Sequence, residues 1–235
     1  MNFLKAEWRK LAIANYEVEP SLLKKYLPNN TELDIWEGKC FVSLVGFMFK
    51  NTRLLGIPIP FHRHFEEVNL RFYVRYCDKG EWKRGVVFIK EIVPKPALTF
   101  VANHIYKEHY QTMKMSHILE QQSDQLRVEY TWKAGLHQHR LRVNASSHPV
   151  EIPENSVTEF ITEHYWGYTK VTEKCTFEYE VVHPRWLAYE VLDHGIDVDF
   201  ETVYGNDFKM LSKRLPSSVM LAEGSEIVVK SKRKI

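Results

Sequence analysis

Asn69, Arg71 and Tyr73 occupy alternate positions of one segment and carry side chains that can hold an anion. In an extended strand, side chains two residues apart point to the same face of a sheet. An arginine guanidinium gives a carboxylate two parallel hydrogen bonds, and a neighbouring tyrosine hydroxyl can orient a carbonyl group. We therefore predict that these three residues bind a small anionic ligand on a cavity wall. The alternative is a solvent-facing surface, which is the ordinary arrangement for an alternating strand.

A second group of titratable and aromatic residues begins at Glu163 and continues through Tyr165 and Trp166. A carboxyl group packed against aromatic rings loses hydration, which raises its pKa towards neutrality, where it can act as a general acid. We predict that Glu163 transfers a proton and that Tyr165 and Trp166 contact the ligand. We also expect Arg71 and Glu163 to face one cavity and to compensate each other's charge, because an unpaired buried charge is costly. The alternative is an aromatic ledge that only packs.

Histidines are paired in two extended segments, His62–His64 and His137–His139, and Glu66 follows the first pair. Two imidazoles and a carboxylate can bind a metal ion, but such pairs are more often surface or packing residues. The three cysteines have no close spacing, and no His-Glu-x-x-His helix, phosphate-binding loop, nucleophile elbow or dinucleotide fingerprint is present. We therefore predict no metal site and no cofactor.

The composition is that of a globular protein with a substantial core. The chain has 235 residues, 44% of them hydrophobic, and a chain of this length buries roughly 70% of its extended surface. Its 32 basic and 30 acidic residues nearly cancel, which gives no electrostatic basis for binding nucleic acid. The longest apolar run, Cys40–Phe49, is about half as long as a membrane-spanning helix. Residues 1–10 do not resemble a signal peptide. We expect a cytoplasmic protein without membrane contact.

Strands must position most of these residues. Alternating polarity predicts a strand over Glu67–Tyr76 and a hairpin formed by Thr31–Trp36 and Cys40–Lys50. Helical spacing predicts a helix over Pro94–Tyr106, and a capping box predicts a short helix over Val157–Thr162. Many strands with short connections indicate a β-rich α+β protein with antiparallel sheets. Closing such a sheet into a barrel would remove its exposed edges.

Four segments spread over nearly the whole chain resemble the YqjF-like family of uncharacterised bacterial proteins, the domain-of-unknown-function family 2071. They are Asn15–Val18, Glu67–Arg71, Phe160–Trp166 and Val182–Trp186. That family is similar in fold to acetoacetate decarboxylase, a cone-shaped antiparallel barrel around a central cavity. The resemblance implies one α+β domain over residues 1–235, with curved antiparallel sheets around such a cavity.

The same resemblance directs attention to lysines. Acetoacetate decarboxylases carry a Pro-Lys-Lys element just after the mid-chain helix, and one of its lysines forms a Schiff base. The corresponding stretch here, Ile105–Lys114, has no such element. Lys107 and Lys114 are the two lysines near that position, and they are the candidates for a reactive amine, which needs a pKa lowered by its surroundings.

These residues, together with the cavity and the lysine chemistry that the resemblance implies, predict a protein that binds a small carboxylate or keto acid, with a lyase-like reaction carried by Glu163 and a lysine. The alternative is a non-catalytic protein that binds a small molecule in the same cavity or has a structural role. The expected partner is therefore a small anionic molecule, and assembly into a homo-oligomer is left open.

Overall fold

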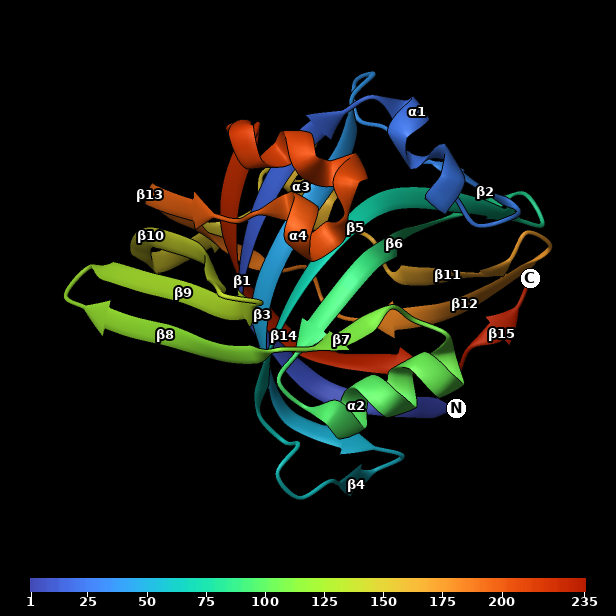
Figure 1. Ribbon diagram of the computed structural model, residues 1–235, viewed down its shortest axis with the longest axis horizontal. Helices are drawn as coiled ribbons and strands as arrows, with labels where there is room; N and C mark the ends of the chain where they lie inside the picture. Colours follow the sequence, from blue (N-terminus) through green and yellow to red (C-terminus); the bar gives the residue numbers. More distant parts are fainter.

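The computed structural model describes residues 1–235 and consists mainly of β-strands (Figure 1). All fifteen strands belong to one hydrogen-bonded sheet. In chain order they are β1 (Asn2–Val18), β2 (Thr31–Leu33), β3 (Cys40–Leu54), β4 (Ile57–Pro58), β5 (Phe65–Asp78), β6 (Glu81–Val93), β7 (Tyr110–Thr112), β8 (Lys114–Gln122), β9 (Gln125–Ala134), β10 (His137–Glu151), β11 (Trp166–Thr172), β12 (Cys175–Val182), β13 (Leu187–Asp197), β14 (Ser218–Lys230) and β15 (Arg233–Lys234).

The helical segments are short and connect or cover the strands. They are α1 (Pro20–Leu23), η1 (Lys24–Tyr26), α2 (Pro96–Val101), the π-helical turn η2 (Ala102–Tyr106), α3 (Val157–Thr162), α4 (Phe200–Tyr204) and η3 (Asn206–Lys213). No helix is both long and apolar enough to cross a membrane.

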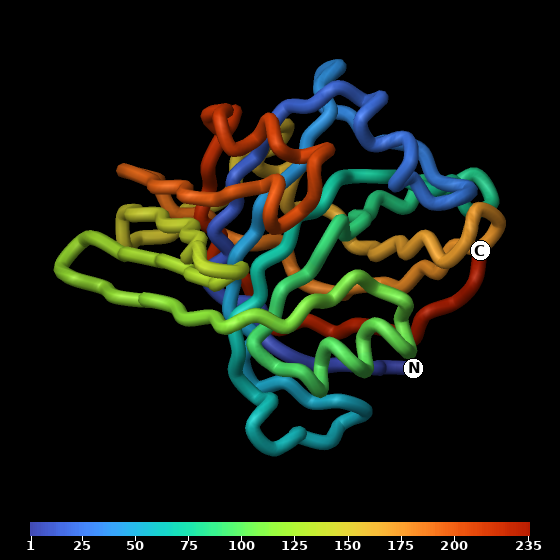
Figure 2. Tube along the Cα trace, viewed as in Figure 1, coloured from blue at the N-terminus to red at the C-terminus, as the bar shows by residue number.

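Seven strands form a closed ring of hydrogen-bonded neighbours. The order is β12, β11, β6, β5, β3, β1 and β14, and β12 pairs again with β14 at Val181 and Val182. All neighbours in the ring are antiparallel except β11 and β6, which share a short parallel pairing. The two ends of the chain lie on the same side of the molecule (Figure 2), where Ser231 N donates to Met1 O at 2.9 Å. The predicted β-rich α+β fold with curved antiparallel sheet is therefore confirmed.

Alternation along the strands gives the sheet two differently packed faces. On β1, Leu11 and Ile13 belong to a hydrophobic cluster of 21 buried residues, whereas Ala12 and Ala14 belong to a second cluster of 33. The larger cluster joins its face of the sheet to β9, β10, α4 and η3. The smaller cluster lies on the opposite face, which carries the cavity described below.

Local sequence explains α3, which packs into the smaller cluster, and the mid-chain helix, which lines the cavity. The predicted helix at α3 is confirmed, and its cap forms as expected because Ser156 Oγ accepts a hydrogen bond from Glu159 N at 3.1 Å. The predicted mid-chain helix begins at Pro96 in the structure and continues through η2 to Tyr106. Lys107 then takes a left-handed conformation, with φ of 62°, and ends the helix.

The predicted hairpin between Thr31–Trp36 and Cys40–Lys50 is wrong. The strand β2 pairs with the far end of β5, where Leu33 lies opposite Val74, and only Trp36 and Lys39 bridge each other. β3 instead pairs with β1 along one edge and with β5 along the other. Neither edge of β3 is therefore available for pairing with β2.

Candidate functional site

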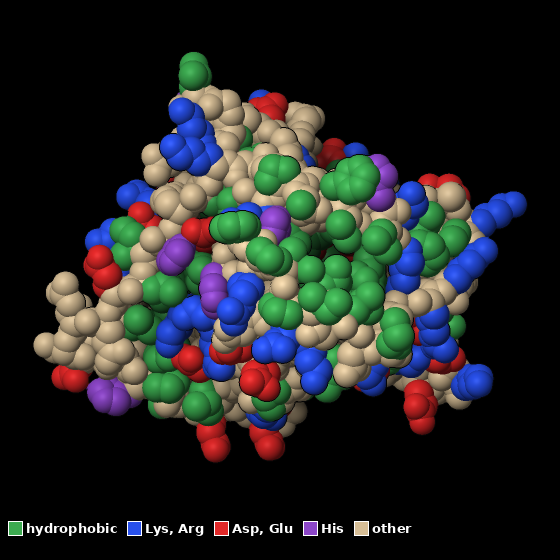
Figure 3. Space-filling model, turned by 90° about the horizontal axis from the view of Figure 1, so that it is seen from below, with side chains coloured by type: hydrophobic (Ala, Val, Ile, Leu, Met, Phe, Trp, Pro, Cys, Tyr) green, Lys and Arg blue, Asp and Glu red, His purple; other side chains and the backbone are tan.

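A cavity of about 330 Å³ lies on the inner face of the ring. Of its 30 lining residues, 21 are hydrophobic. It opens between α2, the beginning of β1 and the connection from β3 to β5, which contribute Leu98, Val101, Phe3 and Ile59 to the lining. Figure 3 shows a hollow on this side of the molecule, surrounded by hydrophobic side chains. The volume is within the range of sites for small organic ligands, roughly 300–1,000 Å³.

The strand β5 places three polar side chains on the cavity wall. Glu67, Asn69 and Arg71 all line it and are buried, with exposed fractions of 2%, 1% and 7%. Asn69 Nδ2 donates to Glu67 Oε1 at 3.0 Å. Asn69 and Arg71 were predicted to face a cavity, and the structure places them there. Glu67 was not among the predicted residues, although it lies two residues before Asn69 and therefore on the same face of the strand.

A β-bulge adds a second carboxyl group to this wall. The pairing of β5 with β6 shifts between Leu70 and Arg71, so that Glu91 lies opposite Asn69 while Phe88 lies opposite Arg71. The extra residue in β6 reverses the alternation. Glu91 therefore faces the cavity together with Phe88, three residues earlier.

The segment after α2 supplies a third carboxyl group. Glu108 follows the left-handed Lys107 and is buried on the cavity wall, where Thr169 Oγ1 donates to its Oε1 at 2.6 Å. Tyr110 lies beside Glu91 in the parallel pairing of β6 with β7, and its hydroxyl donates to Glu67 Oε2 at 3.1 Å. One tyrosine thus links β7 to the carboxyl group of β5.

Burial changes the acidity of all three carboxyl groups. Loss of hydration raises the pKa of Glu67 and of Glu108 to about 7 each, and it raises that of Glu91 well above its usual range. The negative charge of Glu108 adds to the upward shift for Glu67 and Glu91. Because like charges in a low dielectric oppose each other, the cluster holds protons at neutral pH and can donate them.

Arg71 is the only lysine or arginine on the cavity wall. Its Nε is buried without a hydrogen-bond partner. No carboxylate oxygen lies within 4.0 Å of a guanidinium nitrogen, so Arg71 forms no ion pair. A guanidinium stays charged at any pH at which proteins fold. The cavity therefore contains one fixed positive charge whose hydrogen bonds are unused.

A histidine held by a carboxylate forms another part of the wall. His164 Nε2 lies 3.0 Å from Asp34 Oδ2, to which Arg84 Nε also donates at 2.6 Å. Burial lowers the pKa of His164 to about 4, so the ring is neutral at pH 7. Burial would raise the pKa of Asp34, but the hydrogen bonds from His164 and Arg84 outweigh it and hold that pKa below its usual value. His164 therefore donates Nε2–H to Asp34.

The remaining nitrogen of His164 is free. In the neutral ring, Nδ1 carries a lone pair, since Nε2 holds the proton that Asp34 accepts. Nδ1 is buried without a partner, and His164 belongs to the cavity lining. His164 was part of the aromatic run in the sequence, but its relation to Asp34 depends on a contact across 130 residues.

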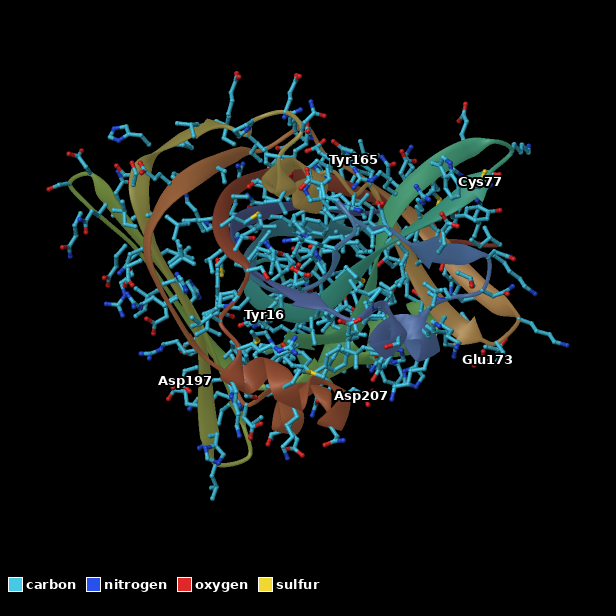
Figure 4. All side chains as sticks on the ribbon, turned by 90° about the horizontal axis from the view of Figure 1, so that it is seen from above. Tyr16, Cys77, Tyr165, Glu173, Asp197 and Asp207 are labelled. Atoms are coloured by element: carbon cyan, nitrogen blue, oxygen red, sulfur yellow. The ribbon has the colours of Figure 1, made fainter.

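Trp166 lines the cavity as predicted, whereas Glu163 and Tyr165 do not. The Tyr165 hydroxyl donates to Glu163 Oε2, and the Tyr165 ring stacks on His183 with 4.5 Å between centroids. Tyr165 lies beside α3 at the edge of the side chains that fill the ring (Figure 4). The expected ion pair between Arg71 and Glu163 is not formed, because Glu163 is occupied by its own neighbour outside the cavity.

Tyr73 and the two candidate lysines also lie off the cavity wall. Tyr73 is buried, but its hydroxyl pairs with Ser43 Oγ at 2.7 Å. Lys107 and Lys114 are exposed, and no lysine belongs to the lining. The left-handed turn at Lys107 directs the next residue, Glu108, into the cavity. Three or more histidine, cysteine, aspartate or glutamate side chains are nowhere grouped so that they could hold a metal ion.

Comparison with known sequences identifies relatives of unestablished function. Residues 5–226 match the family DUF2071, described as an uncharacterized conserved protein. The uncharacterized protein YqjF of Bacillus subtilis (strain 168) is 28% identical over 189 residues, which cover 78% of this chain and 74% of YqjF.

Solved structures of the same fold are acetoacetate decarboxylase-like. The acetoacetate decarboxylase of Legionella pneumophila superimposes with a TM-score of 0.66 at 13% identity, covering 99% of this chain and 87% of that one. The enduracididine biosynthesis enzyme MppR, complexed with pyruvate, gives 0.67 at 10% identity, covering 100% and 90%. An acetoacetate decarboxylase-like enzyme of Sphingomonas wittichii gives 0.68 at 9% identity, covering 100% and 94%. These similarities confirm the fold that the sequence resemblance implied.

Proposed function

The chain belongs to the DUF2071 family, and from its cavity we propose that it binds a small carboxylate or 2-oxo acid that carries an apolar group. The observation that carries the proposal is Arg71. This residue is buried on an otherwise apolar wall, and its guanidinium has no ion-pair partner. A carboxylate would accept the two parallel hydrogen bonds that a guanidinium offers and would neutralise its charge.

The rest of the ligand is defined by the hydrophobic lining. Trp8, Phe47, Phe49, Phe88 and Trp166 surround the polar cluster, and burial of apolar ligand surface against such rings favours binding. A branched or aromatic side chain would use this surface, whereas a three-carbon acid would leave much of it uncovered. The complex of MppR with pyruvate supports the choice of a 2-oxo acid, because it is a protein of the same fold with such a ligand.

The chemistry proposed for this ligand does not pass through a Schiff base. The candidate amines Lys107 and Lys114 are exposed, and the groups that face the ligand are proton donors and acceptors. Glu163 and Tyr165 retain only an indirect role, since they are hydrogen bonded to each other beside the cavity. A binding protein without a reaction is the second candidate, and it would use Asn69, Arg71 and Trp166 in the same way.

Calorimetric titration tests the binding proposal. We expect 4-methyl-2-oxopentanoate to bind the wild-type protein and 4-methyl-2-pentanone, which lacks the carboxylate, to bind much more weakly. Arg71→Met should weaken binding of the acid at least about 30-fold, the effect of removing one partner of a buried charge pair. Arg71→Lys should recover part of it, because the charge remains without the planar fork.

The matched control is Arg75→Met. Arg75 lies on the same strand but is paired with Glu32, with Nε to Oε1 at 2.6 Å, and does not line the cavity. Its substitution should leave affinity unchanged. Equal affinity of the Arg71→Met and Arg75→Met variants, or no binding of any branched or aromatic acid, would contradict the proposal.

A further inference from the structure

We propose that His164 is a proton-abstracting base positioned by Asp34, and that the protein enolises a 2-oxo acid and exchanges the hydrogens on its C3 with solvent. The inference rests on the proposed function, because it requires the acid to lie in the cavity. It adds a reaction, a base and a substrate position to that function.

The base is argued from how the imidazole is held. The His164 side chain is 1% exposed and its ring packs against Tyr73 and Phe160, with centroid distances of 4.7 and 5.2 Å. The hydrogen bond between Nε2 and Asp34 fixes the rotation of the ring and the tautomer. Arg84 Nε donates to the same oxygen, Asp34 Oδ2, at 2.6 Å, and Arg84 Nη2 lies 3.4 Å from His164 Nε2. Nδ1 is thereby fixed as an acceptor.

A purely structural role leaves this arrangement unexplained. A buried polar atom without a partner costs free energy, and buried histidines ordinarily satisfy both nitrogens. The Nδ1 of the buried His183, for comparison, lies 2.9 Å from Pro184 O, whereas Nε2 of His139, which does not line the cavity, is also buried without a partner. His164 Nδ1 has no partner and belongs to a residue of the cavity wall. A ligand that supplies the missing contact is the simplest account of it.

The position of Arg71 defines which ligand atom approaches Nδ1. Arg71, His164 and Glu67 all line the cavity, and the charge of Arg71 lowers the pKa of the other two. A carboxylate held by Arg71 places C2 and C3 of a 2-oxo acid next to that anchor. The apolar group of the acid then extends towards the hydrophobic mouth.

The group assigned as proton donor is Glu91, which also lines the cavity. Its Oε2 is buried without a partner, and Glu91 lies opposite Asn69 on the neighbouring strand. A carboxyl group that keeps its proton can donate it to an oxygen on which negative charge develops. Both oxygens of Glu67, in contrast, accept hydrogen bonds, from Asn69 and Tyr110.

The reaction balances without any further reactant. The C3–H bond breaks and its proton goes to Nδ1, which gives an imidazolium stabilised by ionised Asp34. The electron pair of that bond forms the C2=C3 double bond. The electrons of the C2=O π bond move to the oxygen, which takes the proton of Glu91. The reverse sequence returns a hydrogen from solvent to C3, and nothing is oxidised or reduced.

Hydrogen–deuterium exchange measures this step directly. The wild-type protein and 4-methyl-2-oxopentanoate are mixed in D₂O, and loss of the C3 proton signals is followed by NMR. We expect exchange at least about 100-fold faster than in buffer. His164→Gln should reduce it to the buffer rate while calorimetric affinity changes little, since Arg71 still holds the acid.

Two further variants separate a catalytic from a structural role. Asp34→Asn should slow exchange by about tenfold or more without weakening binding, because it disturbs the tautomer and the imidazolium but not the anchor. His183→Gln, at a buried histidine that does not line the cavity, is the control and should exchange like the wild type.

The outcomes distinguish the inference from the proposal on which it rests. If the wild-type protein binds the acid but exchange stays at the buffer rate, the inference is wrong and the binding proposal stands. If His164→Gln exchanges as fast as the wild type, His164 is not the base. If no acid binds, both are wrong. The wild-type measurement decides the question even where a variant fails to fold.

Discussion

Glu91 of β6 lies directly opposite Asn69 of β5, although simple alternation from Phe88 would turn it to the other face of the sheet. One extra residue in β6 causes this, and it brings a carboxyl group from the second strand into the wall that already holds Glu67. The ring of strands thus supports a cluster of proton-bearing groups beside the single cation Arg71.

The carboxyl cluster makes stability depend on pH. A carboxyl group whose pKa is raised in the folded state binds more protons there than in the unfolded chain, so its contribution to stability falls as pH rises above its ordinary value of 4.5. The free energy of unfolding of Glu67→Gln, relative to that of the wild type, should therefore increase by about 1 to 3 kcal/mol when the pH is raised from about 5 to about 8. Urea unfolding at both pH values measures this difference.

Comparison at each pH removes the opposing effect of His164. Its lowered pKa makes stability rise with pH between about 4 and 6.5, and this term is common to both proteins. The control is Glu81→Gln, at an exposed position that begins β6 and forms no ion pair. If the difference in free energy of unfolding between Glu67→Gln and the wild type were the same at both pH values, the prediction would be contradicted.

Arg71 should reduce the stability of the ligand-free protein. A buried charge without an ion-pair partner loses hydration, and for Arg71 only the contact with the Tyr73 ring, 5.7 Å from the guanidinium carbon to the ring centroid, offsets part of that loss. Arg71→Met should therefore raise the free energy of unfolding by about 1 kcal/mol or more, measured by urea unfolding near pH 6, where the carboxyl groups hold protons. Arg75→Met should not. A loss of stability on Arg71→Met larger than on Arg75→Met would show that Arg71 has a compensating partner in the protein.

Gly167 leaves space for the ring of Tyr179, which lines the cavity. A Cβ at this residue of β11 would lie 2.2 Å from Tyr179 Cζ and 2.5 Å from its hydroxyl oxygen. Gly167→Ala should displace Tyr179, lower stability by about 1–3 kcal/mol and weaken binding of the acid. Gly195→Ala is the control, because its nearest atom is the end of the flexible Arg142 side chain at 3.1 Å. Equal melting temperatures for the two variants would contradict the prediction.

Reductive trapping should leave the protein unmodified. No lysine lines the cavity, and Lys107 and Lys114 are exposed. Borohydride added to the protein with pyruvate or 4-methyl-2-oxopentanoate should give the unmodified mass in mass spectrometry, because a Schiff base needs an amine of lowered pKa beside the ligand. A stoichiometric adduct that depends on the 2-oxo acid would contradict this and would identify the lysine.

Alternation in the sequence predicted the wall of β5 correctly because the strand is regular there. Asn69 and Arg71 keep period two, and extending the pattern to Glu67 would have found the first carboxyl group. Glu91 was out of reach, since a bulge leaves no mark in the pattern of polar and apolar residues. Capping residues predicted α3 for a similar reason: the signal is local and lies within a few residues.

The predictions from the sequence that differ from the structure concern contacts between distant segments of the chain. The aromatic residues after Glu163 favour a place for it in the cavity. Tertiary packing decides which side chain after α3 faces the ring, and His164 is the one that lines the cavity. Asp34 could not be linked to His164 from spacing, because β2 leaves its expected hairpin and pairs with β5. Tyr73 follows Asn69 and Arg71 in the alternation, but its hydroxyl pairs with Ser43 Oγ and does not line the cavity.

A crystal structure with 4-methyl-2-oxopentanoate tests the central claim most directly. We expect the carboxylate to form two hydrogen bonds with the Arg71 guanidinium, about 2.7–2.9 Å long, with the branched carbon chain among Phe47, Phe88 and Trp166. An acid bound in the reverse direction, with its carboxylate at the mouth beside α2 and no contact to Arg71, would contradict the account.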